Sequence, residues 1–161
     1  MGAELLDIGD GVALSQLGPL CIALWRDEVT RPRFNRQAAA LAAVVAAHRG
    51  SAGFMCIVEA GSKPPNDELR RASARMIDSH GADLVFVAAV IEGSGFQAAL
   101  TRSVLTAISL FIPRSKPKIG FFSNVMDAAL WGRDHTTIPT ATARAVVAHV
   151  QAMRADLTGG R

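Results

Sequence analysis

The chain of 161 residues has few aromatic side chains and no tyrosine; phenylalanine and tryptophan together make up 6% of it. Surfaces that bind nucleic acids usually combine a dense basic stripe with aromatic side chains that stack on the bases. Here the net charge is only +3, and the basic residues are dispersed along the chain. We therefore expect no nucleic-acid partner.

Cysteine is also scarce. The only two cysteines, Cys21 and Cys56, both lie inside apolar runs, and neither belongs to a C-x-x-C pair. This pattern predicts two buried free thiols rather than a disulfide.

No two histidines form an H-x-x-x-H pair, so we expect no metal site. The histidines are His48, His80, His135 and His149.

Two kinds of targeting segment are missing. Residues Met1–Ile8 carry the acidic Glu4 and Asp7 and have no basic region of the kind that opens a signal peptide. The longest apolar stretches are interrupted by Arg, Ser or Thr and are too short to span a membrane. We expect a cytoplasmic protein with no integral membrane segment.

Half of the residues are hydrophobic, which is enough to build the core of one domain of this length. Short apolar runs bounded by Gly, Pro or Asp predict strands. The first two runs after Gly11 meet at Gly18-Pro19, which indicates a hairpin. The predicted strands are Leu5–Ile8, Val12–Leu17, Leu20–Trp25, Phe54–Glu59, Leu84–Ile91 and Lys118–Phe122.

Helical periodicity separates these strands. A first helix begins near Pro32 and ends before Gly50, with Phe34 and Leu41 on its inner face and Gln37 pointing away from it. Asn66 and Asn124 are suited to cap two further helices. The remaining two predicted helices are Phe96–Phe111 and Thr140–Leu157.

This order predicts an α/β fold in a single domain. Alternating strands and helices indicate a mixed, mostly parallel sheet of about five to six strands with helices packed on it. The first strands form an antiparallel hairpin. We assign residues 1–132 to this α/β domain and residues 133–161 to a linker and an extra C-terminal helix appended to the same domain.

The best candidate for an anion site is the turn Gly93-Ser94-Gly95, between a strand and a helix. With Ala98 it matches a G-x-G-x-x-A fingerprint, whose amides can hold a phosphate. The alternative is a tight turn with a helix cap. The acidic ribose partner of a dinucleotide site is expected about 20 residues on, but the chain reads Ile112-Pro113-Arg114-Ser115 there. We expect no cofactor.

Two acidic residues also follow predicted parallel strands. Glu59 and Glu92 can therefore be neighbours at one edge of the sheet, where α/β proteins usually bind ligands. We favour the simpler interpretation that each is a solvated strand end. The chain has no G-x-S-x-G nucleophile elbow and no sequence motif that places a histidine beside a serine, so we expect no enzyme activity.

The predicted helix after Gly95 has more apolar surface than one sheet can cover. Its first apolar line is Phe96, Leu100, Val104, Ala107 and Phe111. A second line, Leu105, Ile108 and Ile112, needs another partner, because a helix that is apolar nearly all round is usually buried. We interpret this second line, with Arg102 beside it, as a protein interface. Arg102 is expected to extend along the surface or to pair with Glu92.

The segment Glu92–Leu110, E-G-S-G-F-Q-A-A-L-T-R-S-V-L-T-A-I-S-L, follows the strand Leu84–Ile91 and precedes Lys118–Trp131. In this order of elements, from Val12 to Trp131, the chain resembles bacterial STAS-like domains, the group of anti-sigma-factor antagonists and CRAL-TRIO-like small proteins. The resemblance implies a regulatory signalling protein that acts through protein contacts without a cofactor.

Classical members of that group carry a phosphorylatable serine in the loop after a central strand. The matching residue here is Ser62, although Glu59-Ala60-Gly61-Ser62-Lys63 replaces the usual D-x-S pattern. Three hypotheses follow for the function. The first is a non-catalytic interaction module that forms a homodimer, the second a carrier of a small apolar or lipid-like ligand, and the third a nucleotide- or phosphate-binding enzyme that uses the Glu92–Gly95 turn.

Overall fold

The computed structural model describes residues 3–95, 98, 99, 102, 103, 106, 107, 110, 117–136 and 142–159. They form a six-stranded sheet whose strand order follows the chain. The pairs β1–β2 and β2–β3 are antiparallel, and β3 to β6 run parallel, which confirms the predicted mixed α/β fold. The strands are β1 (Ala3–Gly9), β2 (Val12–Leu17), β3 (Leu20–Trp25), β4 (Ala52–Val58), β5 (Leu84–Ile91) and β6 (Lys118–Phe122).

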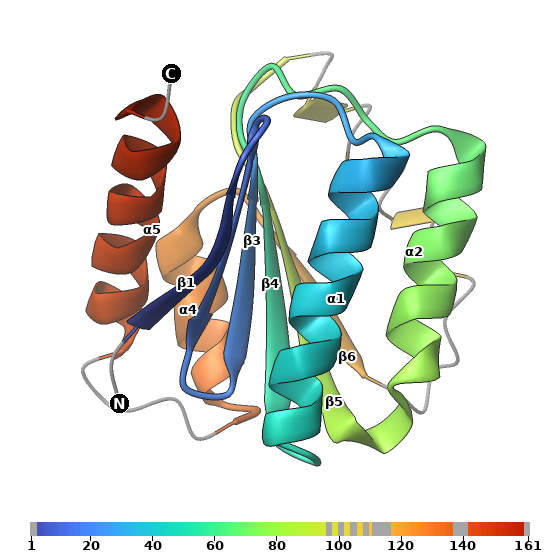
Figure 1. The fold of residues 1–161 in the computed structure, drawn as a ribbon, viewed down its shortest axis with the longest axis vertical. Coiled ribbons are helices and arrows are strands. Elements are labelled where there is room, and N and C mark those ends of the chain that lie inside the picture. Colours follow the sequence, from blue (N-terminus) through green and yellow to red (C-terminus); the bar gives the residue numbers. More distant parts are fainter. Residues whose placement is uncertain are drawn as a thin grey trace.

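Helices cover both faces of the sheet (Figure 1). On one face, which we call the front, lie α1 (Arg31–Ala47) and α2 (Asp67–Ser79). On the other face, the back, lie α4 (Val125–Arg133) and α5 (Thr142–Gly159). Strands buried on both faces need apolar side chains in both directions, which explains the continuous apolar runs in β3 and β5.

Local sequence signals set where three helices begin. The Asn66 side chain accepts a hydrogen bond from the Leu69 amide at 2.9 Å, and Asn124 accepts one from the Asp127 amide at the same distance. These bonds satisfy amides that a helix leaves without internal partners. Both predicted caps are confirmed. In α1 the cap is Thr30, and Pro32 lies in the first turn as predicted.

The prediction for Gln37 is wrong. Its side chain is only 5% exposed and lies under α1, where its Oε1 accepts a hydrogen bond from Trp25 Nε1 at 2.7 Å. The indole N–H of Trp25 is buried and requires an acceptor. The hydrogen bond to Trp25 on β3 therefore explains why the polar side chain of Gln37 lies in the core.

The predicted helix Phe96–Phe111 is described only in pieces. Residues 98, 99, 102, 103, 106 and 107 are helical, and Leu110 lies in a turn. The Ala99 amide donates to the Gly95 carbonyl at 3.1 Å. The other residues of that helix lie outside the part of the chain that the structure describes.

Candidate functional site

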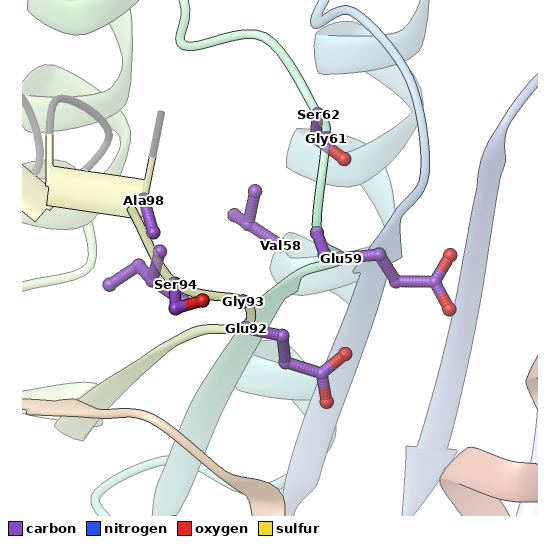
Figure 2. A pocket seen from close by; sticks show the side chains of 10 residues that line it. Val58, Glu59, Gly61, Ser62, Glu92, Gly93, Ser94 and Ala98 are labelled. Carbon is purple, nitrogen blue, oxygen red and sulfur yellow. The ribbon is translucent and has the colours of Figure 1, made fainter. Parts of the chain in front are cut away.

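Two carboxylates meet where the central parallel strands end. Glu59 directly follows β4 and Glu92 directly follows β5, and these strands are neighbours in the sheet. Figure 2 shows both side chains projecting in the same direction, away from the Ser94 and Gly61 turns. The expected proximity of the two glutamates is therefore observed.

Two arginines neutralise these carboxylates. Arg26, which follows β3, donates from Nε to Glu59 Oε2 at 2.7 Å. Arg154 of α5 brings its Nε to 3.1 Å from Glu59 Oε1, and its Nη2 donates to Glu92 Oε1. We call these four side chains the carboxyl-edge cluster. Two negative and two positive charges make it neutral, so its acids are engaged by protein cations.

The predicted pairing of Glu92 needs a correction. Glu92 pairs with Arg154, 62 residues further along the chain. Arg102 is exposed, and its carbonyl accepts a hydrogen bond from the Thr106 hydroxyl at 2.9 Å. Nothing in the local spacing links Arg154 to either glutamate. Only the docking of α5 against the sheet brings it to this edge.

The turn Gly93-Ser94-Gly95, which follows β5, fits the interpretation as a tight turn with a helix cap. Gly93 has φ +91° and Gly95 has φ +88°, a region that glycine adopts without steric cost. A Cβ at Gly93 would lie 2.9 Å from the Cβ of Ala60, so the two loops approach closely here.

The pocket beside this turn is small. Its volume is about 60 Å³, whereas sites for ligands of drug size measure roughly 300–1,000 Å³. Glu59 and Glu92 line it together with Ser94, and both carboxylates are already paired with arginines. The strand order also never reverses, so the described sheet lacks the switch point at which α/β folds open a ligand crevice.

Ser62, the residue at the position of the regulatory serine, is a buried donor in this structure. Its side chain is 4% exposed, and its hydroxyl faces the Arg26 carbonyl at 2.8 Å and the Trp25 carbonyl at 3.2 Å. The hydroxyl thus ties the loop after β4 to the end of β3. A kinase could reach it only after this loop opened.

The predicted interface falls largely outside the structure. Leu105, Ile108 and Ile112 lie outside the described residues, while Arg102 is exposed. Leu110 belongs to neither predicted apolar line, and 79% of its side chain is exposed. Among the large hydrophobic residues described as exposed, Leu5 reaches 43% and Leu130 38%. Leu110 is therefore an exposed apolar residue of the predicted interface segment that belongs to neither apolar line of the sequence analysis.

A second polar contact holds α5 to the sheet. Ser15 on β2 is fully buried, and its hydroxyl donates to the Glu4 carbonyl at 2.6 Å. That hydroxyl hydrogen is therefore in use, so His149 Nε2, 2.5 Å from Ser15 Oγ, acts as the donor. Burial lowers the pKa of His149, an effect that Asp156 partly opposes. Ser15 is thus a buried structural hydroxyl and not an exposed nucleophile.

Further hollows open among the described residues, including one of about 310 Å³ beside Arg33 and Lys63. A polar hollow of about 740 Å³ is lined by Asp10, Arg26, Asp27 and Asp156, and an apolar one of about 50 Å³ lies beside Phe34.

Within the described ranges, no three His, Cys, Asp or Glu side chains are placed to hold a metal ion. None of the helices described has the length and apolar character to cross a membrane.

Both cysteines are free. Cys21 faces Phe54 across the β3–β4 pair, while Cys56 faces Ala23, so the two residues are not directly opposite each other. Burial raises the pKa of the Cys21 thiol to about 12. The predicted absence of a disulfide between them is confirmed; Cys21 is buried as predicted, whereas Cys56 is only half-buried.

Comparisons with known proteins identify no relative. No family model, no curated protein and no solved structure matches the chain.

Proposed function

We propose that this chain is a non-catalytic protein-interaction module that forms a homodimer through the segment after Gly95. One observation carries the proposal: Leu110, in that segment, has 79% of its side chain exposed. Single exposed leucines are common on protein surfaces. This one belongs to the same segment as the apolar line Leu105, Ile108 and Ile112 that the sequence predicts as an interface, and we propose that a second copy covers this segment.

The sheet edges favour helix contacts over strand pairing. In the part of the chain described, β1 and β6 are the outer strands. β1 has an irregular register between Leu5 and Asp7, and β6 has only five residues and begins with Lys118. Bulges, short strands and edge lysines all discourage pairing between sheets. A dimer built through the helical segment avoids these obstacles.

The described site supports the non-catalytic part of the proposal. The acids of the carboxyl-edge cluster are paired with Arg26 and Arg154, and the adjoining pocket of about 60 Å³ is too small for a nucleotide. The apolar pocket of about 50 Å³ gives the carrier hypothesis no support. In line with the STAS-like resemblance, we propose a regulatory role in the cytoplasm.

Sedimentation velocity over a wide concentration range tests the dimer. We expect the wild-type chain to dimerise and Leu110→Glu to weaken the dimer at least about tenfold, because an interface residue would carry an unpaired charge. Leu130→Glu, on α4, is the matched control, since Leu130 is also exposed. The proposal fails if the wild type stays monomeric at high concentration, or if both variants have the same effect.

A further inference from the structure

The attachment of α5 to the sheet differs from that of α1 and α2. Each of those helices connects two neighbouring parallel strands: α1 links β3 to β4, and α2 links β4 to β5. Neither can leave the sheet without pulling on both strands. α5 follows α4 and links no two strands of the sheet. It can therefore separate from the back face while every strand pair remains formed.

The apolar contact of α5 is narrow. Three of its side chains are at most 1% exposed, Val146, Val150 and Met153, and they lie on one stripe of the helix. Three half-buried apolar side chains, Ala143, Val147 and Leu157, pack at the margin of this stripe, and most of the other side chains of α5 are exposed. Holding a helix of 18 residues in place costs conformational entropy, and this cost opposes the stabilisation that the apolar contact provides. Elements with few buried apolar contacts open at lower free energy than the core.

Charged groups supply much of the remaining attachment. Arg154 spans Glu59 and Glu92, while Arg26 donates to the Thr158 hydroxyl at 2.9 Å and to the Arg154 carbonyl at 3.4 Å. Arg26 thus places a cation at the C-terminal end of α5, where the helix dipole favours it. Interactions of this kind weaken as salt is added.

The fit of Arg154 is incomplete. Its Nε is buried and has no hydrogen-bond partner within the described residues, although Glu59 Oε1 lies 3.1 Å away. A buried donor without an acceptor is costly, and opening of the helix would return it to water. Arg154 therefore holds α5 through its contacts with Glu59 and Glu92, while the cost of its buried Nε favours separation of α5 from the sheet.

We propose that α5 is a latch that opens as a unit while the rest of the domain stays folded, with Arg154 as the group that holds it closed. Opening frees the carboxylate of Glu92 and leaves Glu59 paired with Arg26 alone, at the edge where parallel sheets usually bind ligands. It also uncovers the back surface of β1–β3, including Ala13, Ile22 and Leu24. The latch is independent of the proposed dimer, because it involves no residue of the predicted interface segment between Gly95 and Pro113.

Hydrogen exchange of the full chain, resolved by residue, tests the latch. In the wild type we expect the amides of α5 to exchange at least about tenfold faster than those of β4 and β5, and to speed up further when NaCl is added. This comparison needs no variant. If α5 and the central strands share one exchange rate at low and high salt, α5 leaves only when the whole domain unfolds, and the proposal is wrong.

Arg154→Met then tests the residue assigned to the latch. We expect it to speed exchange in α5 about 10- to 100-fold, as for the loss of a charged hydrogen bond, and to reduce the response of α5 to salt. Arg144→Met is the matched control, because Arg144 lies on the same helix and is exposed. Equal effects of the two substitutions would overturn the role of Arg154.

Discussion

The two faces of the sheet are covered by helices of different kinds. The front helices, α1 and α2, are crossover connections between parallel strands, so the chain itself holds them against the sheet. The back helices, α4 and α5, follow the last parallel strand, β6, and connect no two strands of the described sheet (Figure 1). The comparison indicates that the front layer unfolds with the sheet, whereas α5 on the back can open first.

Both layers also have polar contacts. On the front, a buried neutral bond joins Trp25 and Gln37, and Arg36 of α1 pairs with Asp7 of β1. On the back, α5 is fixed by His149, which titrates, and by Arg154, which is charged. We expect the attachment of α5 to respond to pH and salt through these two residues.

The largest expected effect comes from truncating the core of each layer. Leu41 of α1 and Met153 of α5 are both at most 1% exposed, and each substitution by alanine removes a large apolar side chain. We expect Leu41→Ala to lower the free energy of unfolding by about 2–5 kcal/mol, measured by urea denaturation. It should leave hydrogen exchange in α5 unchanged, because α5 opens without unfolding α1. Met153→Ala should speed exchange in α5.

The comparison between layers fails if Leu41→Ala accelerates exchange in α5 as much as in β4. Such a result would mean that both layers unfold in one step. The two substitutions remove side chains of similar size, so a difference between them reports the position of the residue and not the volume that is lost.

Gln37→Leu probes the neutral bond of the front layer. It leaves the buried Trp25 N–H without its acceptor, which we expect to lower the free energy of unfolding by about 1–3 kcal/mol. Urea denaturation followed by tryptophan fluorescence measures this loss. Gln151→Leu, at an exposed position of α5, is the control and should change stability little. Similar losses in both variants would contradict the structural role of Gln37.

Ser62→Ala removes the hydroxyl that ties the loop after β4 to the end of β3. We expect the free energy of unfolding to fall by about 0.5–1.5 kcal/mol, since this is the usual net contribution of such a hydrogen bond. Ser62→Asp should cost more, because it buries a charge at a position that is 4% exposed. Thermal unfolding compares both with Ser94→Ala, an exposed serine of the adjoining turn. An unchanged stability in Ser62→Asp would show that the loop opens readily enough for phosphorylation.

The smallest expected effect is a pH dependence from His149. Burial lowers its pKa below the ordinary value of 6.5, so the unfolded chain binds the proton more tightly than the folded one. This contribution to stability is complete above pH 6.5 and is lost as the pH falls through the lowered pKa. His80, whose pKa burial also lowers, adds a slope of the same sign.

His149→Gln isolates this contribution, since glutamine keeps an N–H donor for Ser15 but does not titrate. The difference in free energy of unfolding between wild type and variant should change between neutral and mildly acidic pH. The interpretation fails if that difference stays constant over the same range. His80 is present in both proteins, so its contribution cancels.

Much of the architecture could be predicted because its signals are local. The bounds of β2, β3, β5 and β6 agree with the apolar runs that predicted them, since residues buried on both faces of a sheet leave an uninterrupted pattern. The caps Asn66 and Asn124 bond to amides three residues away. Glu59 and Glu92 could be placed together because parallel strands end at one edge.

The amino-acid sequence alone determined the order of elements, the mixed sheet and the position of the two glutamates, because each depends on neighbouring residues or on the direction of adjacent strands. Tertiary structure decided that Arg154 neutralises those glutamates, that Gln37 turns inward to Trp25, and that His149 meets Ser15. In each of these pairs the partners lie on different elements, and only the packing of helices on the sheet brings them within hydrogen-bonding distance.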